Sequence, residues 1–413
     1  MQIVLTPPCR LSGRIVLPSS KSISNRVLVI NALSGSGNVP NNVSVCDDTR
    51  VMVRALTEDT PVVDIMAAGT AMRFLTAYFA VKEGTEKVLT GTERMQQRPI
   101  SILVNALRQL GGEVNYVKQE GFPPLAVSGH VLEGCEVSLQ GNVSSQYISA
   151  LLMIGPMLKN GLRLRLEGDV ISRPYIQLTL QLMKDFGAQA DWEDEQVIVV
   201  KPTPYQPIPF TVESDWSAAS YWYEMMALSG DADARIELPG LYACSYQGDC
   251  AVATLFEQLG VKSVYDEEHQ SVTLFREGKV VECMEYDFVN QPDLAQTFVV
   301  TCCMLGVHFR FTGLQSLKIK ETDRMAALIC ELRKLGYLLR EENDRVLEWT
   351  GERCEAEPDA AIDTYDDHRM AMAFAPACMK LGTLRINQPQ VVSKSYPQYW
   401  DDLQIVGFKL SEV

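Results

Sequence analysis

The stretch VNALRQLGGEVNYV, from Val104 to Val117, contains a pattern of apolar residues and glycines that predicts local structure. Its first half is amphipathic and ends at Leu110-Gly111, and a glycine just past an apolar helix is a common C-cap. The segment that follows, Glu113 to Val117, alternates as a short half-buried strand does. The stretch therefore predicts an amphipathic helix that turns at a glycine into a strand.

The same helix ending recurs along the chain at a nearly constant interval. LQLMKDFGA, TLFEQLGV, ELRKLGY and DDLQIVGF each end an apolar segment at a glycine, and strand candidates follow all but the last. The intervals are 76, 73, 76 and 71 residues. The glycines are Gly111, Gly187, Gly260, Gly336 and Gly407. Self-similarity at a fixed period indicates a repeated structural unit.

A second set of segments has the same rhythm, and in each of them polar or small residues open onto an apolar helix. The six are SSKSISNRVLVINAL, AGTAMRFLTAYFA, NVSSQYISALLMIG, SDWSAASYWYEMMAL, QPDLAQTFVVTCCML and DDHRMAMAFAPACM. Helices that are apolar on all sides are buried. We therefore expect sheets wrapped around central helices in six units, three to a domain. The first unit is shortened, because DTPVVDIMAAGT follows its helix-like segment almost directly.

Composition excludes several classes of protein for these 413 residues. A formal net charge of -15 disfavours nucleic acid as a partner, since a nucleic-acid site needs a basic face. No apolar run reaches about 18 residues, so no membrane span is expected. The start, MQIVLTPPCRLSG, does not resemble a secretory signal. With 11 cysteines and 4 histidines that are not clustered, we expect reduced thiols, a cytoplasmic location and no zinc site.

The beginnings of the buried helices carry side chains suited to anions. A helix N-terminus offers free N–H groups and a positive dipole end, and lysine and arginine add charge there. One such beginning is more typical of a solvated capping turn, but repetition in equivalent places favours an anion site. The segment KIKETDR adds a further cluster, and Arg98 and Arg173 stand directly before prolines. The helix-start residues are Lys21, Ser22, Arg26, Gly69, Thr70, Arg73, Ser144, Ser145, Gln146, Asp293, Asp367, His368 and Arg369.

Eight motifs in order resemble those of the EPSP synthase family, the 3-phosphoshikimate 1-carboxyvinyltransferases. They are LPSSKSISNR, AGTAMR, ERMQQRPI, GNVSSQYISALL, SRPYI, KIKETDR, YDDHRMAM and SKSYPQYW. The resemblance covers essentially the whole chain. KETDR with DHRMAM alone would indicate the wider enolpyruvyl transferase superfamily, whereas the SSQ and SRPY motifs point to its shikimate branch.

The resemblance implies an α/β fold with two inside-out domains, each built from three βαβαββ-type units. Residues 1–19 and 214–413 are expected to form one domain and residues 20–213 the other, so that the chain crosses between them twice. The N-terminal segment would then supply the closing strand of the last unit. On this interpretation no strand follows Gly407.

The reaction that the resemblance implies moves the enolpyruvyl group of phosphoenolpyruvate to the 5-hydroxyl of shikimate 3-phosphate. Addition gives a tetrahedral intermediate, and elimination then releases phosphate. Asp293 is the expected base at the hydroxyl, with Lys320 beside it, and Glu321 is the candidate for proton transfer at the methylene carbon. The roles of Asp293 and Glu321 could be reversed. Lys21 completes the expected catalytic group.

The substrate ligands are likewise implied by the resemblance. For shikimate 3-phosphate they are Lys21, Ser22, Arg26, Ser144, Ser145, Gln146, Ser172, Tyr175, Asp293, Ser316 and Lys320. For phosphoenolpyruvate they are Lys21, Gly69, Arg98, Gln146, Arg324, His368, Arg369 and Lys394. These residues come from both domains, so the site is expected to be complete only when the domains close. No metal, no organic cofactor and no partner beyond the two substrates is expected, and the chain should be a monomer.

The sequence departs from the family pattern in the first unit and at three residues. Ala67 and Phe74 stand where asparagine and proline are common, and Ser316 replaces a frequent asparagine. Two rival functions stay open at this point. Transfer of the same group to a UDP-sugar typically uses a loop cysteine, and no matching loop follows ERMQQRP. A non-catalytic anion-binding relative is disfavoured by the retention of Asp293, Lys320 and Glu321.

Overall fold

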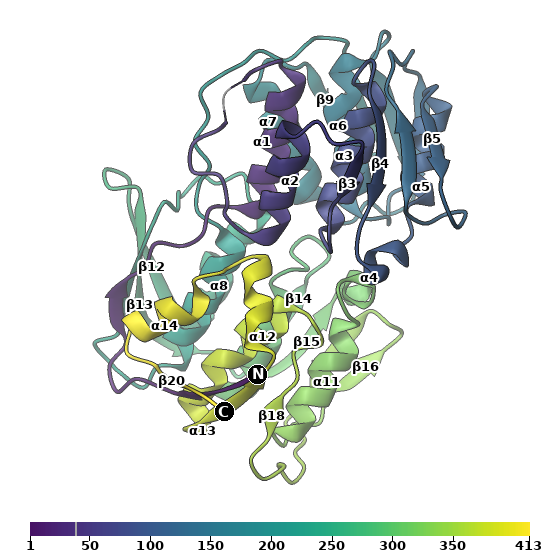
Figure 1. The fold of residues 1–413 in the computed structure, drawn as a ribbon. Helices are drawn as coiled ribbons and strands as arrows, with labels where there is room; N and C mark the ends of the chain where they lie inside the picture. The colour runs from purple at the N-terminus through teal and green to yellow at the C-terminus, as the bar shows by residue number, and fades with distance from the viewer. Residues whose placement is uncertain (38) are drawn as a thin grey trace. The chain divides into compact units, whose positions relative to one another are not determined.

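The computed structural model describes residues 1–37 and 39–413, and it divides into two compact units. The discontinuous unit consists of Met1–Pro18 and Glu213–Val413. The inserted unit consists of Ser19–Val212. The insertion falls inside one structural repeat, because β2 (Ser12–Arg14) precedes it and α8 (Trp216–Leu228), the next element of that repeat, follows it (Figure 1).

Five four-stranded sheets share one topology, and together they confirm the predicted strand–helix–strand–helix–strand–strand repeat. In each sheet the first strand of the repeat runs parallel to the second, and the remaining strands add antiparallel. The sheet orders are β3-β4-β6-β5, β7-β8-β10-β9, β2-β11-β13-β12, β14-β15-β17-β16 and β18-β19-β1-β20, read from the first strand of each repeat.

The inserted unit contains two complete repeats after its first pair of helices, α1 (Lys21–Leu33) and α2 (Asp47–Thr57). The second repeat comprises β3 (Val62–Asp64), α3 (Gly69–Val81), β4 (Glu86–Thr90), α4 (Glu93–Gln96), α5 (Ser101–Gln109), β5 (Glu113–Tyr116) and β6 (Leu125–Ser128). The third comprises β7 (Glu136–Gln140), α6 (Ser145–Ile154), η1 (Gly155–Met157), β8 (Leu162–Glu167), α7 (Arg173–Asp185), β9 (Ala190–Trp192) and β10 (Val197–Val200).

The discontinuous unit contains three repeats. With β2 and α8, the first comprises β11 (Arg235–Pro239), η2 (Gly248–Ala251), α9 (Val252–Glu257), β12 (Leu259–Asp266) and β13 (Ser271–Val280). The second comprises β14 (Cys283–Asp287), α10 (Ala295–Leu305), β15 (His308–Thr312), η3 (Leu314–Ile319), α11 (Arg324–Lys334), β16 (Arg340–Glu342) and β17 (Val346–Trp349). The third comprises β18 (Ala361–Ile362), α12 (His368–Phe374), η4 (Ala375–Ala377), α13 (Cys378–Leu381), β19 (Leu384–Asn387), η5 (Pro389–Lys394), α14 (Tyr399–Ile405) and β20 (Lys409–Glu412), and β1 (Gln2–Thr6) closes its sheet.

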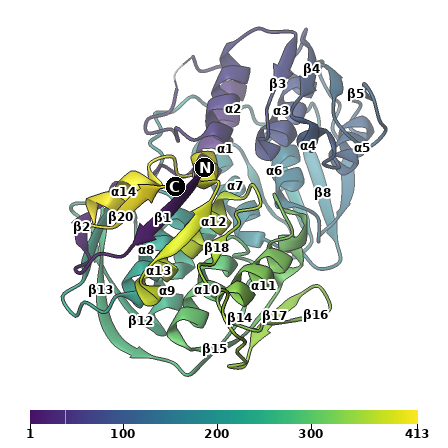
Figure 2. The same cartoon turned by 60° about the horizontal axis from the view of Figure 1, so that its bottom comes forward.

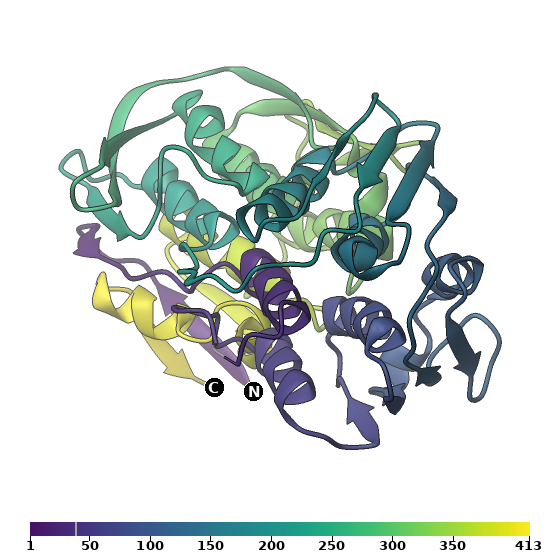
Figure 3. The same ribbon diagram turned by 90° about the horizontal axis from the view of Figure 1, so that it is seen from above.

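The last sheet corrects one expectation and confirms another. β1 from the N-terminus lies between β19 and β20 and pairs antiparallel with both, as expected of a closing strand. The expectation that no strand follows Gly407 is wrong, because β20 begins two residues later and pairs with β1 (Figure 3). This repeat therefore has all four strands, three from the C-terminal end of the chain and one from its start.

The first repeat is shortened, as the sequence predicts. α2 ends at Thr57 and β3, the first strand of the next repeat, begins at Val62. Within the described residues this repeat has no four-stranded sheet, and its backbone pairing is an isolated parallel bridge between Asn41 and Thr211. The missing hairpin therefore accounts for the early arrival of the next buried helix in the sequence.

The helices that are apolar on all sides form the core of each unit. α8 buries every residue except Ser217, and α3 buries every residue except Val81. In the inserted unit α3 packs on α1 and α6, and in the discontinuous unit α10 packs on α8 and α12. Figure 2 shows the sheets of the discontinuous unit around these helices. This arrangement leaves the helix starts, with their polar side chains, at one end of each core.

Glu224 is fully buried in the middle of α8, and burial raises the pKa of its carboxyl well above 4.5. The folded state therefore holds a proton that the unfolded state releases above that pH, so Glu224 makes the free energy of unfolding fall as pH rises. In Glu224→Gln we expect this fall to be smaller between pH 5 and pH 8, by about 1.4 kcal/mol for each unit of pKa shift. Urea unfolding at several pH values measures the difference. The matched change at exposed Glu268 should leave the pH dependence unaltered, and equal slopes in both variants would contradict the assignment.

Candidate functional site

Seven charged side chains of the discontinuous unit meet in one ion-pair network, which we call the Asp293 cluster. They come from the segments just before α10 and α11, from the first residue of α11, from the start of α12 and from the end of η5. The cluster holds three carboxylates and four cations. Its members are Asp293, Lys320, Glu321, Arg324, Asp367, Arg369 and Lys394.

Asp293 faces three of the four cations. Its Oδ1 lies 3.3 Å from both Lys320 Nζ and Arg324 Nη1, and its Oδ2 accepts a hydrogen bond from Arg369 Nη2 at 2.9 Å. Burial by itself would raise the pKa of Asp293, but the cations outweigh it and hold that pKa well below its usual value of 3.8. Asp293 is therefore an ionised carboxylate in this state of the protein.

Arg324 is the buried centre of the cluster, with a side chain only 1% exposed. Its Nε donates to Asp367 Oδ2 at 2.7 Å, and its Nη2 donates to Glu321 Oε2 at 2.9 Å. Burial would lower the pKa of Arg324, but the carboxylates of Asp367, Glu321 and Asp293 raise it instead. Asp367 also caps α12 by accepting from the backbone N–H of Arg369, so one carboxylate fixes both the arginine and a helix start.

The other predicted residues of the discontinuous unit lie around this centre. Lys394 Nζ donates to Glu321 Oε1 at 2.9 Å, and His368, which is 1% exposed, has Nδ1 3.7 Å from Asp367 Oδ1. Ser316 lies in η3, on the segment that leads to Lys320, and no ion pair or hydrogen bond places it in the cluster among the described residues. Lys318 turns away and pairs with Glu341 at 2.7 Å.

Asp293 is not the N-cap of the apolar helix that follows it. Because it precedes an apolar helix, it could have served as the N-cap, but α10 begins at Ala295 and its cap position is Leu294, which makes no side-chain cap bond. The carboxylate of Asp293 is bound by the three cations instead. Its side chain therefore belongs to the charged cluster.

In the inserted unit, the start of α3 offers a second group of cations. Ala68 precedes this helix and gives no side-chain cap, and Gly69 is its first residue. A Cβ at Gly69 would lie 2.6 Å from Arg98 Nη1 and 3.0 Å from Arg73 Nη1, so both guanidinium groups approach the glycine closely. Free helix N–H groups next to two guanidinium groups form a favourable environment for an anion.

Gln146, in the first turn of α6, reaches the same place. Its Oε1 accepts from Arg73 Nη1 at 2.5 Å, and its Nε2 donates to Thr70 Oγ1 at 3.0 Å. Ser144 caps α6 by accepting from the backbone N–H of Gln146, and Ser145 is the first residue of the helix. The starts of α3 and α6 are thus joined through side chains.

A third group lies where α1 and α7 begin. Lys21 Nζ is 3.5 Å from Asp48 Oδ2, while Arg26 is buried and donates to Thr179 Oγ1 at 2.7 Å and to Ser149 Oγ at 3.1 Å. Its Nη1 also donates to the backbone oxygen of Ser22 at 2.9 Å. Burial lowers the pKa of Arg26 to about 10, and the neighbouring Tyr175 opposes this in part. The acceptors of the buried Arg26 guanidinium named here are all neutral, so they do not neutralise its positive charge, and that charge can attract an anionic ligand.

Five of the ten described non-glycine residues with positive φ lie shortly before α3, α7, α12 or η5. Ser172, just before α7, has φ of 56°, a left-handed conformation that is uncommon for residues other than glycine. Such outliers cost about 1–3 kcal/mol each and are retained mainly where surrounding structure holds them at functional sites. Further residues with positive φ precede α3, α12 and η5. They are Met66, Tyr365, Asp366 and Gln388.

The sequence predicted some members of these groups but not the residues with which they pair. Arg73 and Asp367 appeared only as helix-start residues, and Asp48 and Thr179 were missed. Thr179 lies one turn after Tyr175 on α7, which was the available signal. Arg173 differs from Arg98, because it donates to the backbone oxygen of Glu195 at 2.6 Å and lies over the ring of Trp192.

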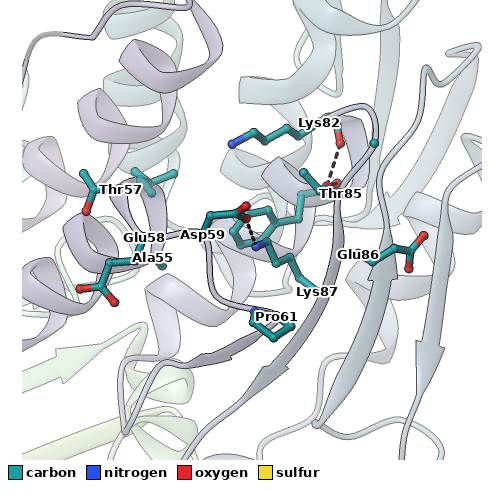
Figure 4. Close-up of a pocket in the computed structure, with 12 residues that line it drawn as sticks. Ala55, Thr57, Glu58, Asp59, Pro61, Lys82, Thr85, Glu86 and Lys87 are labelled. Carbon is teal, nitrogen blue, oxygen red and sulfur yellow. Dashed lines mark hydrogen bonds and ion pairs between the residues drawn. The ribbon is translucent and has the colours of Figure 1, made fainter.

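A separate cavity of about 520 Å³ lies in the inserted unit, at the C-terminal ends of α2 and α3. It is lined by Thr57, Lys82 and Lys87, among others, and Figure 4 shows Lys87 turned toward Asp59, which it contacts at 2.6 Å. No predicted site residue lines it. Within residues 1–37 and 39–413, no group of acidic, histidine or cysteine side chains is placed to hold a metal ion, and no helix is long and apolar enough to cross a membrane.

Comparisons with known proteins point to one family. The model of the family EPSP synthase (3-phosphoshikimate 1-carboxyvinyltransferase) matches residues 5–60 and 56–403. A 3-phosphoshikimate 1-carboxyvinyltransferase of Bacteroides fragilis is 62% identical over 408 residues, which cover 99% of this chain and 98% of that protein. Another, from Sulfurovum sp. (strain NBC37-1), is 35% identical over 433 residues, with 98% and 99% covered.

A solved structure extends the likeness to the fold. The EPSP synthase from Acinetobacter baumannii aligns over 100% of both chains with a TM-score of 0.79 at 17% sequence identity. A TM-score of this size over both whole chains shows that the two proteins share one fold. Because the family pattern and full-length relatives both span nearly the whole sequence, the chain belongs to the EPSP synthase (3-phosphoshikimate 1-carboxyvinyltransferase) family.

Proposed function

We propose that this chain transfers the enolpyruvyl group of phosphoenolpyruvate to the 5-hydroxyl of shikimate 3-phosphate and releases phosphate. The observation that carries the proposal is the Asp293 cluster, in which two partly exposed carboxylates, Asp293 and Glu321, face four cations. The reaction needs a proton acceptor, a proton donor and positive charge for phosphate and carboxylate groups. The cluster contains all of these.

In the addition step, the hydroxyl oxygen bonds to the central carbon of phosphoenolpyruvate and the methylene carbon gains a proton. We assign the hydroxyl proton to Asp293, with Lys320 beside it, and the methylene proton to Glu321. In the elimination step, the bond to the phosphate oxygen breaks, the new methyl group returns a proton to Glu321, and the leaving phosphate takes the proton held by Asp293. The same two carboxylates could serve with their roles exchanged.

Substrate binding supplies a reason for Asp293 to become a better base. Its low pKa arises from Arg369, Lys320 and Arg324, and a carboxylate with so low a pKa is a weak proton acceptor. The same cations are the proposed partners of the substrate anions. When an anion shares these cations, their hold on Asp293 weakens and its pKa rises. The binding of both substrates would thus make Asp293 a stronger proton acceptor.

The proposal divides the ligands between the units. The inserted unit would supply most contacts to shikimate 3-phosphate, through Lys21, Ser22, Arg26, Ser144, Ser145, Gln146, Ser172 and Tyr175. The discontinuous unit would supply Asp293, Ser316 and Lys320 to that substrate and Arg324, His368, Arg369 and Lys394 to phosphoenolpyruvate. Lys21, Gly69, Arg98 and Gln146 would complete the phosphoenolpyruvate ligands. Arginine suits the bidentate contacts and lysine the point charges.

Phosphate release with different acceptors tests the proposal. We expect release from phosphoenolpyruvate with shikimate 3-phosphate and none with a UDP-sugar or without an acceptor. Release with the UDP-sugar alone would overturn the choice of acceptor. A protein that binds both substrates without release would be a non-catalytic relative. The proposal includes a monomeric, cytoplasmic enzyme, and light scattering of the purified chain checks the oligomeric state.

Gly69→Ala should selectively weaken the binding of phosphoenolpyruvate. The added methyl would lie 2.6 Å from Arg98 Nη1 and 3.0 Å from Arg73 Nη1, so both guanidinium groups must move. The clashing atoms belong to side chains and not to the backbone, and alanine favours a helix. We therefore expect a nearly unchanged melting temperature and a KM for phosphoenolpyruvate raised about 10-fold, which corresponds to about 1.4 kcal/mol. Steady-state kinetics in both substrates provide the measurement.

Gly230→Ala is the matched control, because no atom lies within 4 Å of a Cβ at that position. Its kinetics should equal those of the unmodified chain. An unchanged KM for phosphoenolpyruvate in Gly69→Ala would show that this helix start does not contact the substrate.

A further inference from the structure

The side-chain amide of Gln146 is held in one orientation. Arg73 Nη1 lies 2.5 Å from Oε1, and Thr70 Oγ1 lies 3.0 Å from Nε2. An amide oxygen only accepts hydrogen bonds, while its nitrogen carries two donors, and a guanidinium only donates. The atom that faces Arg73 must therefore be the oxygen, and the amide nitrogen keeps one further N–H beyond its bond to Thr70.

Arg73 is itself fixed by neutral groups. Its side chain is nine-tenths buried, its Nη1 also donates to the backbone oxygen of Gly69 at 3.1 Å, and its guanidinium lies 4.9 Å from the centre of the Tyr147 ring. Its Nε is buried and has no hydrogen-bond partner within the described residues. No carboxylate among the described residues forms an ion pair with Arg73, so its positive charge is not neutralised by one.

We infer that Arg73, together with Thr70, is a positioning residue that turns Gln146 so that an N–H, and not an oxygen, meets an anionic group of the substrate. The inference rests on the proposed function, in which Gln146 contacts both substrates. An oxygen turned toward a phosphate or carboxylate would repel it, whereas a hydrogen bond to a charged group contributes about 1.5–3 kcal/mol. Arg73 thus determines that Gln146 presents a hydrogen-bond donor to the substrate, although Arg73 itself does not contact the substrate.

A double-mutant cycle tests the coupling. The cycle compares Arg73→Met, Gln146→Met and the double variant. We expect each single change to raise the KM of an anionic substrate about 10-fold or more, with the larger effect on phosphoenolpyruvate. The double variant should be no worse than the more severe single variant, because both remove the same contact. Gln146→Glu should be worse than Gln146→Met, since its second oxygen would replace the N–H. Arg108→Met is the control, because Arg108 also lies over a ring, Tyr116 at 5.1 Å.

A purely structural role for Arg73 would give other results. Multiplying effects in the double variant, or a lowered melting temperature with unchanged KM values in Arg73→Met, would overturn the inference. If Arg73→Met does not fold, Thr70→Val and Thr70→Ser replace it: valine should raise the KM and serine, which keeps the hydroxyl, should restore it. Unchanged KM values in Gln146→Met overturn the inference while phosphate release by the unmodified chain stands. Absence of that release overturns the proposed function instead.

Discussion

Replacing Asp293 by asparagine is expected to lower turnover by about 10²-fold or more, because an amide cannot take the hydroxyl proton. The structure also predicts an effect of this change on stability. Asp293 caps no helix, and its two oxygens face Lys320, Arg324 and Arg369, so an amide must point its nitrogen at a cation. We therefore expect the free energy of unfolding to fall by about 1–3 kcal/mol as well. Single-turnover phosphate release and calorimetric binding of shikimate 3-phosphate separate rate from binding.

Asp323→Asn supplies the control for this experiment. Asp323 belongs to the same KIKETDR segment, caps α11 by accepting from the backbone N–H of Ala326 at 3.1 Å, and is 38% exposed. Asparagine caps a helix about as well as aspartate, so turnover should stay near native. If Asp293→Asn also turned over within a few-fold of native, the base would have to be Glu321.

Replacing Arg324 by methionine should cost more stability than any other single change considered. Its guanidinium binds Asp367, Glu321 and Asp293, and Asp367 is fully buried. Removing one partner of a buried ion pair leaves an uncompensated charge and costs about 3–5 kcal/mol. The repelling carboxylates should also disorder the cluster, so turnover should become unmeasurable. Urea unfolding and the phosphate-release assay give the two quantities.

Arg310→Met is the matched comparison for Arg324. Arg310 also binds two carboxylates, Glu342 and Glu348, each at 2.8 Å, but its side chain is 41% exposed. Exposed ion pairs contribute about 0–1 kcal/mol, so this variant should lose little stability and no activity. Equal losses of stability in the two variants would mean that the burial of Arg324 does not increase the cost of removing its guanidinium.

The sequence predicted the repeat because periodic glycines and all-apolar helices are local signals. Gly111, Gly187, Gly336 and Gly407 follow helix ends directly in the structure, whereas Gly260 is the second residue of β12. The shortened first repeat was visible as an early helix start. β20 was missed because its residues, Lys409–Glu412, are mostly exposed and show no apolar alternation. Its place is set by pairing with β1, about 400 residues earlier in the chain, and such long-range pairing leaves no local pattern.

The candidate site was predictable in its residue types but not in its pairings. Lys318 and Lys320 stand two residues apart, yet Lys320 faces Asp293 and Lys318 faces Glu341. Arg98 and Arg173 both precede prolines, yet Arg98 approaches Gly69 and Arg173 lies over Trp192. Which way a side chain turns depends on the backbone path and on partners distant in sequence, and a motif contains neither.

The identity of the product made from phosphoenolpyruvate and shikimate 3-phosphate tests the proposed reaction. Mass spectrometry of the reaction mixture should show a compound that keeps the shikimate phosphate and gains one enolpyruvyl group, formed in equal amount to the phosphate released. With Asp293→Asn under the same conditions, this compound should form at least about 10²-fold more slowly. Phosphate release without this product, or no reaction of the unmodified chain with shikimate 3-phosphate, would show that the chain does not catalyse the proposed reaction.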